Sequence, residues 1–397
     1  MRKGLQVGMT LYHLNRRRGT VTQAVVQRLE NGSVVVEFEQ AVAGFKQVTL
    51  PITSIGEWLF FTREDAAASE DSLALRDEYR AFGNARLVRL YNSRYSPAAR
   101  RRSSRGPLLE TLQRHGFRGF LHYTDFANFV QIMEDGYLYS RSLVQKSLPC
   151  DAADPDVLEN TSTDTFEYAR FFYRPKTPTL YSNAGIKLGN SRPHMPIPVL
   201  LVFRDELIYH DSVLFLDGGG GSHKSTRTAD AREALQFDWD AVFRMDGYPG
   251  EEKNKRNAEF LYPDKVSTAY LKRIVFRAQP DLDRARLILG ENPLYTVDRN
   301  QFPDPRYQRG DRNYLCSFVV KPTESEGVFA VIGQFYSDPG AYTHELRITR
   351  AGKEKSAQIK PKRLPNGSYL IGRVRRPVSR IAYYMEGHQC GLWEDAR

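Results

Sequence analysis

Alternating apolar and polar positions mark the first sixty residues as a set of short β-strands. The pattern flanks Asn31-Gly32, a dipeptide typical of tight hairpin turns. Its apolar positions are Val21, 24–26, 34–36, Phe38, 48–50 and 58–61. We therefore predict that residues 1–62 form a small SH3-like or KOW-like β-barrel. Barrels of this kind bind nucleic acid or protein, and the fold alone does not say which.

The next segment, residues 63–116, changes character. A helical pattern runs from Ala66 to Tyr79, and an arginine-rich run follows from Arg100 to Pro107. Such a run cannot pack into a core, so residues 63–116 are expected to be a helical and basic linker. A phosphate-contacting arm and an inert solvated connection are both compatible with it.

The central block, residues 117–278, mixes helical and strand patterns, and alternation returns in residues 279–397. Glycine and proline separate the later runs, which predicts a C-terminal β-sandwich. These runs are 315–320, 328–335, 345–349, 369–374 and 381–385. The chain is thus expected to be α+β, with a central core flanked by a barrel and a sandwich.

Charge directs attention to polyanionic partners. The 397 residues carry a formal net charge of +10 and a sequence pI of about 9.4, which favours nucleic acid, although a basic surface kept for solubility is the alternative. No long apolar run suggests a signal peptide or a membrane span. The cysteines, Cys150, Cys316 and Cys390, are far apart and odd in number. A disulfide framework or a zinc site is not expected, and a reducing cytoplasm fits.

One acidic residue stands where a basic segment becomes apolar. In the run from Lys255 to Asp264, Glu259 precedes Phe260-Leu261-Tyr262, a short strand closed by Pro263. A carboxylate at the mouth of a strand is held rigidly and can reach a cleft. Taken alone, a glutamate beside Lys and Arg is more often a solvated surface acid.

A second polar group follows the apolar start of another strand. His122 and Thr124 are two residues apart in the predicted strand 120–125, so both side chains point to one face. Asp125 can cap the helix predicted from Phe126 to Gly136. A core histidine satisfied by its neighbour is the alternative interpretation of this motif.

Aromatic and cationic residues alternate from Tyr168 to Tyr181. Flat rings stack on bases or on nicotinamide, and Arg or Lys meets phosphates, but an aromatic strand packed in the core gives the same pattern. The run 215–222 contains four consecutive glycines without the Lys-Ser/Thr of a phosphate-binding loop, and it is expected to be a flexible loop.

Taken in order, these segments resemble the DarT family, bacterial toxins that transfer ADP-ribose from NAD onto bases of single-stranded DNA. The resemblance covers about 160 residues and excludes the first sixty. It rests on His122-Tyr123-Thr124 with Asn128 and Gly136, on 168–181, 196–203 and 217–218, on Phe237-Asp238-Trp239 and on 257–261.

The resemblance implies an ADP-ribosyltransferase-like split β-sheet that grips NAD+, the co-substrate, without a metal. Glu259 would be the catalytic glutamate, binding the ribose 2′-hydroxyl and stabilising the oxocarbenium-like state as nicotinamide leaves. It would also accept the proton of the attacking base nitrogen. Arg170 would act beside it near the nicotinamide.

The resemblance also implies two groups of binding residues. His122 and Thr124 would hold the adenosine-side or the nicotinamide-side ribose. The whole NAD-binding group is Tyr123, Asn128, Tyr139, Ser140, Arg141 and Tyr168 together with these two. Residues expected to contact DNA or NAD phosphates are Arg174, Lys176, Tyr181, Arg256 and Asn257.

Some positions depart from the family pattern. Many relatives have an arginine where Lys176 stands, so a bidentate contact becomes a point charge here. Residues 144–160 offer no counterpart to a further arginine that some members use near nicotinamide. The segment 169–175 is closer to the guanine-modifying branch than to the thymine-modifying branch.

The resemblance implies a cytoplasmic toxin or defence enzyme that acts on single-stranded DNA. Its implied partner is a cognate antitoxin, a macrodomain-type hydrolase that removes ADP-ribose. Two alternatives stay open from the sequence. One is a nucleic-acid-binding protein with an inactive transferase core, and the other is a transferase whose target is RNA or protein.

Overall fold

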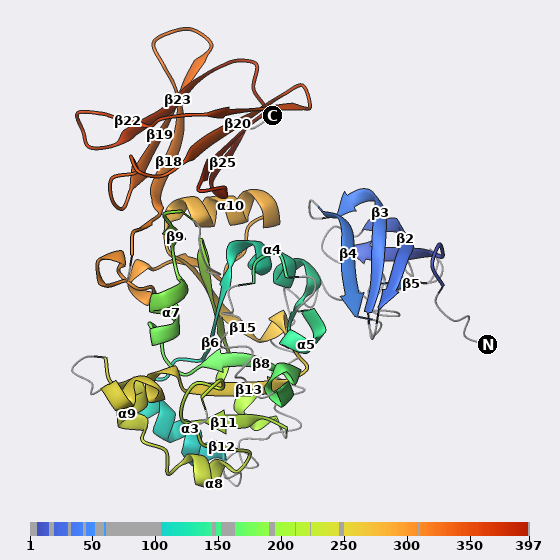
Figure 1. Ribbon diagram of the computed structural model, residues 1–397, viewed down its shortest axis with the longest axis vertical. Helices are drawn as coiled ribbons and strands as arrows, with labels where there is room; N and C mark the ends of the chain where they lie inside the picture. The colour runs from blue at the N-terminus through green and yellow to red at the C-terminus, as the bar shows by residue number, and fades with distance from the viewer. Residues whose placement is uncertain are drawn as a thin grey trace.

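The protein is a mixed α/β chain with several separate sheets (Figure 1). The computed structural model describes residues 6–15, 20–30, 33–42, 45–51, 59–60, 105–144, 148–151, 163–189, 195–210, 212–222, 224–245, 250–308 and 310–395. The helix expected over residues 66–79 and the arginines at 100–102 lie outside these residues.

The N-terminal residues form one antiparallel sheet of five strands. Their order is β4-β3-β2-β1-β5, and β2 pairs with β3 on either side of the predicted Asn31-Gly32 turn. The strands are β1 Thr10–Asn15, β2 Thr20–Glu30, β3 Ser33–Val42, β4 Phe45–Pro51 and β5 Leu59–Phe60. Alternate side chains such as Leu11, Val26 and Val36 form its small core, as the period-two pattern predicted.

The central sheet has eight strands in the order β12-β11-β13-β8-β6-β10-β15-β16. All its pairings are antiparallel except that of β15 with β16. The strands are β6 Phe120–Asp125, β8 Tyr168–Phe172, β10 Pro198–Phe203, β11 Leu214–Leu216, β12 Arg227–Thr228, β13 Glu259–Pro263, β15 Leu271–Phe276 and β16 Tyr295–Val297. The predicted strands at 120–125 and 260–262 are confirmed.

The central sheet is split between β6 and β8. These strands share a single residue pair, Leu121 with Phe172, whereas β6 pairs with β10 along its whole length. Because β6 and β8 part after one pair, the strands on either side of the gap form two half-sheets.

Short helices surround this sheet and begin where the sequence provides caps. Helix α4, Phe126–Asp135, starts at Asp125, whose side chain accepts from the Ala127 N–H at 2.9 Å, and stops at Gly136 with φ 77°. The other α-helices of this part are α3 Arg105–Arg114, α5 Arg141–Val144, α7 Pro178–Asn183, α8 Ala231–Ala234, α9 Trp239–Phe243 and α10 Gln279–Leu289. Two short strands, β7 Tyr137–Tyr139 and β14 Lys265–Ser267, pair with each other.

Helix α3 corrects one expectation. The basic run was expected to stay unpacked as far as Pro107, yet α3 begins at Arg105. The reason is the apolar pair that follows, because Leu108 and Leu112 are one helical turn apart and fully buried in the central core.

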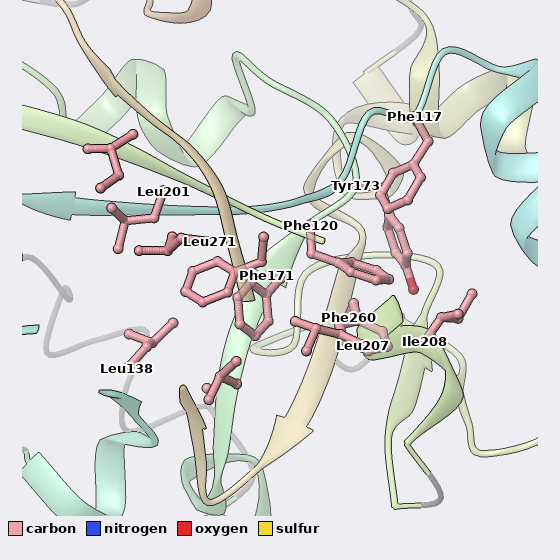
Figure 2. Packing of buried hydrophobic residues seen from close by; sticks show 14 of the residues in the cluster. Phe117, Phe120, Leu138, Phe171, Tyr173, Leu201, Leu207, Ile208, Phe260 and Leu271 are labelled. Carbon is pink, nitrogen blue, oxygen red and sulfur yellow. The ribbon is translucent and has the colours of Figure 1, made fainter. Parts of the chain in front are cut away.

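Aromatic rings fill the core on one face of the central sheet. Phe120, Phe171 and Phe260 come from three neighbouring strands, and the rings of Phe120 and Phe260 stack with centroids 3.8 Å apart (Figure 2). All three side chains are fully buried. This packing fixes β13, and therefore the position at which Glu259 enters the strand.

Two four-stranded sheets at the C-terminal end enclose one further core. Their orders are β18-β19-β23-β22 and β21-β20-β24-β25, and Val331 and Ile371 of one sheet meet Leu346 and Tyr383 of the other. The strands are β18 Leu315–Pro322, β19 Val328–Phe335, β20 His344–Arg350, β21 Lys353–Gln358, β22 Lys362–Arg363, β23 Tyr369–Arg375, β24 Arg380–Met385 and β25 His388–Glu394. A short pair, β9 Ile186–Lys187 with β17 Arg312–Asn313, precedes them.

Helix α10 joins the central sheet to the C-terminal sheets (Figure 1). Its Arg284 lies over the ring of Phe126 at 3.7 Å and donates to the carbonyl of Gln389. Because β16 also belongs to the central sheet, the boundary expected at residue 278 falls inside this unit. Among the helices that the structure describes, none has the length and hydropathy that a membrane crossing requires.

We expect Phe260→Ala to lower the free energy of unfolding of the central domain by about 3–5 kcal/mol, because it removes a fully buried ring. Val319→Ala is the control, since that side chain is 47% exposed and its loss should cost less than about 0.5 kcal/mol. Urea denaturation followed by fluorescence measures both. Equal effects of the two substitutions would contradict the packing described here.

Candidate active site

Glu259 and Arg170 form a bidentate ion pair on neighbouring strands. The Nε of Arg170 donates to Oε2 of Glu259 at 2.8 Å, and its Nη2 donates to Oε1 at 2.7 Å. Glu259 is the first residue of β13 and pairs with Phe172, so Arg170, two residues before Phe172 on β8, shares its face of the sheet. The Glu259 side chain is 5% exposed and that of Arg170 is 31% exposed, so the pair opens to solvent on the arginine side.

The glycine-rich run lies directly against this ion pair. A Cβ atom at Gly220 would come within 2.9 Å of Oε2 of Glu259 and 3.1 Å of Nη2 of Arg170. The loop is held by Asn254, whose Oδ1 accepts from the Gly219 N–H at 3.2 Å and whose Nδ2 donates to Ser225 Oγ at 3.0 Å. The run 215–222, which was expected to be a flexible loop, is instead held by these hydrogen bonds. Its close approach to the ion pair is possible because glycine has no side chain.

Burial dominates the protonation of Glu259. Loss of solvent raises the pKa of its carboxyl above the ordinary value, while Arg170 and the main-chain N–H of Gly220 oppose this rise. Burial thus favours the protonated form of Glu259, whereas the guanidinium of Arg170 and the Gly220 N–H favour the anion.

His122 is linked to the ion pair through the main chain of Arg170. Its Nδ1 lies 2.9 Å from the Arg170 carbonyl oxygen, so Nδ1 carries the hydrogen and Nε2 is left as an acceptor. Burial lowers the pKa of His122, which favours this neutral form. The ring thus bridges β6 and β8 at the point where these strands part.

Strand alternation places the expected site residues of β6 on two different faces of the sheet. His122 and Thr124 pair with Leu201 and Val199 of the aromatic core face, as the expectation of a shared face required. Tyr123 points to the other face, the one that carries Glu259 and Arg170. Its hydroxyl donates to the Gln301 carbonyl at 2.9 Å and lies 3.3 Å from the Lys176 N–H.

Asn128 and Arg141 both contact the segment 148–151. Asn128 Nδ2 donates to the Cys150 carbonyl at 2.7 Å, and its Oδ1 accepts from the Cys150 N–H at 2.9 Å. Arg141 forms a bidentate pair with Asp151, at 3.1 and 2.6 Å. These expected NAD-binding residues therefore position a neighbouring loop.

The other expected NAD-binding residues lie close to the start of β8. Ser140 is fully buried, donates its N–H to the Asp264 carbonyl at 2.6 Å, and lies between Tyr139 of β7 and Arg141 of α5. Tyr168 opens β8 and pairs with Pro263 of β13. The rings of Tyr139 and Tyr168 are partly exposed and border the half-sheet that carries Arg170.

The residues expected to contact DNA do not share one environment. Arg174 is 1% exposed, and its guanidinium donates to the carbonyl of Arg244 at 2.6 Å, which is an interior role in place of the expected surface contact. Arg256 is also buried and donates to the Met245 carbonyl at 3.3 Å. Lys176 and Tyr181 are partly exposed, on either side of the start of α7.

Asn257 ties the segment before Glu259 to helix α7. Its Oδ1 accepts from both the N–H and the hydroxyl of Thr179 at 3.1 Å. Pro178 begins α7 directly after the capping residue Thr177. Glu259, the glycine loop and α7 are therefore held in one hydrogen-bonded group.

Sequence reasoning missed Gly220 and Asn254 as parts of this site. The four consecutive glycines were the available signal, since such a run allows a backbone to approach another group closely. Within the described ranges, no group of three or more His, Cys, Asp or Glu side chains could hold a metal ion.

Removing the arginine of the pair should make protein stability depend on pH. We expect Arg170→Met to cost about 3 kcal/mol at neutral pH, because a buried carboxylate loses its cation, and to raise the pKa of Glu259 further. A raised pKa means that ionisation opposes folding, so the loss should shrink as the pH falls below that pKa. Thermal unfolding across a pH series measures this.

Two further variants control this experiment. Arg170→Met combined with Glu259→Gln removes the charge and should recover most of the loss. Arg347→Met breaks a pair with Glu345 of similar geometry, at 2.7 Å, in which both side chains on β20 are partly exposed, and should cost less than about 1 kcal/mol. A pH-independent loss in the Arg170 variant would show that the carboxylate is not responsible.

Solved DarT structures resemble part of this chain at low identity. DarT from Thermus sp. 2.9 in complex with ADP-ribosylated ssDNA is 18% identical with a TM-score of 0.40, covering 47% of this chain and 100% of that one. The same protein with NAD+ gives 19% and 0.37, covering 46% and 96%. Thermosipho africanus DarTG with ADP-ribose gives 17% and 0.39, covering 47% and 51%.

The family comparison is more direct than these structural likenesses. No protein of curated function matches the sequence. Residues 121–303 match the family described as DarT, ssDNA thymidine ADP-ribosyltransferase, and this range contains β6, β8, the glycine loop and β13. The chain is therefore similar to the DarT family over residues 121–303, a little under half of its length.

Proposed function

We propose that this protein transfers ADP-ribose from NAD+ to a base of single-stranded DNA and releases nicotinamide. The observation that carries the proposal is the position of Glu259, a buried, charge-balanced carboxylate at the mouth of a strand inside the family-matched range. An unpaired strand exposes base nitrogens without the cost of opening a duplex.

In the proposed reaction the bond between the ribose C1′ and the nicotinamide nitrogen breaks, and a bond between C1′ and a base nitrogen forms. Positive charge develops on the ribose as nicotinamide leaves, and a fixed carboxylate near the 2′-hydroxyl stabilises that charge. The proton of the attacking nitrogen passes to Glu259, whose raised pKa suits a group that accepts a proton.

The hydrogen-bond capacity of Glu259 supports this role. A carboxylate has roughly four acceptor positions. Arg170 occupies two of them, and the N–H of Gly220 takes another. About one position is left, which suffices for a single ribose hydroxyl. In this proposal Arg170 holds the carboxylate in place and faces the nicotinamide end of the co-substrate.

The remaining site residues are assigned by their places around the split sheet. We assign His122 and Thr124, with Tyr123, to the ribose side of NAD+. Because His122 and Thr124 point to the face of β6 opposite Glu259, they would reach the co-substrate at the opening where β6 and β8 part. The acceptor Nε2 of His122 suits a hydroxyl donor there. Asn128 and Arg141 would order the loop 148–151 around the co-substrate, and Ser140 would hold the start of α5 through its bond to Asp264. Tyr139 and Tyr168 offer rings at its edge.

DNA recognition in this proposal uses the exposed side of the hydrogen-bonded group. Lys176, Tyr181 and Asn257 lie on or next to α7, beside the segment that leads to Glu259. Arg174 and Arg256 would position this surface from the interior. The family description names thymidine, whereas the segment 169–175 favours guanine, so we propose either base as the acceptor.

The biological setting is proposed from the family. A toxin of this kind requires an antitoxin, and a macrodomain-type hydrolase that removes ADP-ribose is the partner we propose. We propose a reducing cytoplasm as the protein's location, since the sequence carries three cysteines, an odd number. We further propose that the N-terminal sheet is an SH3-like or KOW-like barrel and that the C-terminal sheets form a β-sandwich, both flanking the transferase core.

Glu259→Gln tests the proposed reaction. We expect a loss of about 10²–10³-fold or more in ADP-ribosylation of a single-stranded oligonucleotide, because the amide lacks the charge that stabilises the ribose cation. Mass spectrometry of the oligonucleotide after incubation with NAD+ detects the adduct and identifies the base. Protein that binds DNA but yields no adduct with any base would favour the inactive-core alternative, and adducts only on RNA or protein would change the target.

Gly220→Ala tests the contact above the ion pair. The added methyl group would lie 2.9 Å from Oε2 of Glu259, so it should displace the carboxylate or the loop and lower kcat at least about ten-fold. Gly250→Ala is the matched control, because no atom lies within 4 Å of its added Cβ. Equal rates for the two variants would show that the loop does not set the position of Glu259.

A further inference from the structure

Residues 299–308, at and beyond the end of the family-matched range, expose an unusual group of arginine and tyrosine side chains. Tyr307 is 73% exposed, the highest value among the exposed large hydrophobic residues of the described chain. The Arg306 and Arg299 side chains are 69% and 57% exposed. Nothing in the catalytic proposal uses these three residues.

The group is held in place by one carboxylate. Asp304 pairs with Arg306 at 2.7 Å, accepts from the Arg306 N–H at 3.1 Å and accepts the hydroxyl of Tyr336. Arg306 lies 5.7 Å from the centre of the Tyr307 ring, and Arg299 lies 5.4 Å from that of Tyr336. An exposed ring is thus presented on a fixed turn, which lowers the entropic cost of stacking a ligand on it.

Hydrogen bonds connect this turn to the face of the sheet that carries Glu259. The Gln301 carbonyl accepts the Tyr123 hydroxyl at 2.9 Å. Gln308 Nε2 donates to the carbonyls of Tyr181 and Ala184 at 2.9 and 2.8 Å, at the C-terminal end of α7.

Helix α7 spans the distance between the turn and the site. Its N-terminal end, through Thr179, contacts Asn257, which lies two residues before Glu259. Six residues of helix extend about 9 Å, so the turn lies roughly one short helix away from the reacting segment. Figure 1 shows α7 and β9 along the same side of the central sheet.

The chemistry of the turn fits an unpaired nucleotide. Arg299 lies 4.0 Å from Asp304, so two arginines share one carboxylate and one positive charge is left over. A base stacks on an exposed tyrosine ring, and a neighbouring phosphate is attracted by the remaining charge. A duplex cannot use such a ring, because its bases are already stacked on each other.

We propose that the platform formed by Tyr307 and Arg299 binds a nucleotide of the single-stranded DNA that flanks the modified base. The proposal rests on the proposed function of the site. It makes the segment 299–308 a determinant of how long a strand the enzyme prefers, and it extends the DNA path from Asn257 along α7 to the junction with the C-terminal sheets.

The test compares two oligonucleotides with the same target base. The short one holds only that base and its immediate neighbours, and the long one extends on both sides. We expect Tyr307→Ala to reduce the advantage in kcat/KM of the long oligonucleotide over the short one by about five-fold to a hundred-fold. Tyr307→Phe keeps the ring and should retain that advantage.

Salt dependence tests the phosphate contact separately. Arg299→Ala should lower the slope of log affinity for the long oligonucleotide against log salt by about one, while Arg286→Ala, a similarly exposed arginine on α10, should leave it unchanged. Leu287→Ala, which is 43% exposed, controls for loss of an exposed apolar side chain.

The outcomes separate the two proposals. If the wild-type protein modifies neither oligonucleotide, the proposed function fails. If it modifies both, and Tyr307→Ala and Arg299→Ala each behave like their controls, only the platform is overturned. A loss confined to the long oligonucleotide supports the platform.

Discussion

The whole site depends on the bidentate contact between Glu259 and Arg170. A buried carboxylate without a cation would cost several kcal/mol, and a cation free to move would leave the anion in no fixed place. The protein meets both conditions with two adjacent strands whose register puts the side chains on one face. The aromatic core packed against β13 fixes this strand and therefore fixes the position of the carboxylate.

The split between β6 and β8 gives the sheet its functional geometry. One residue pair joins these strands, and the His122 ring bridges them where they part. A fully paired sheet would present flat faces only. Here two half-sheets are joined only at the pair Leu121 and Phe172. The residues proposed to hold the co-substrate lie on both sides of this junction.

Much of this arrangement could be predicted from the sequence. Local signals, such as the Asp125 cap, the Gly136 stop and the strand ending at Pro263, depend on short-range chemistry and were confirmed. The partner of Glu259 depends on the register of two strands separated by about ninety residues, and periodicity alone does not fix that register. The interior place of Arg174 was missed for a similar reason, since its carbonyl partner lies seventy residues away.

The contact between Arg284 and β25 shows that the family-matched segment and the packed structural unit have different C-terminal limits. The family match ends at residue 303, yet the guanidinium of Arg284, which lies over the ring of Phe126, donates to the carbonyl of Gln389 in β25. A fragment that ends at residue 303 would leave that guanidinium beside α4 without its carbonyl partner. The packed unit around α4 and α10 therefore includes a residue of β25, far beyond the end of the family match.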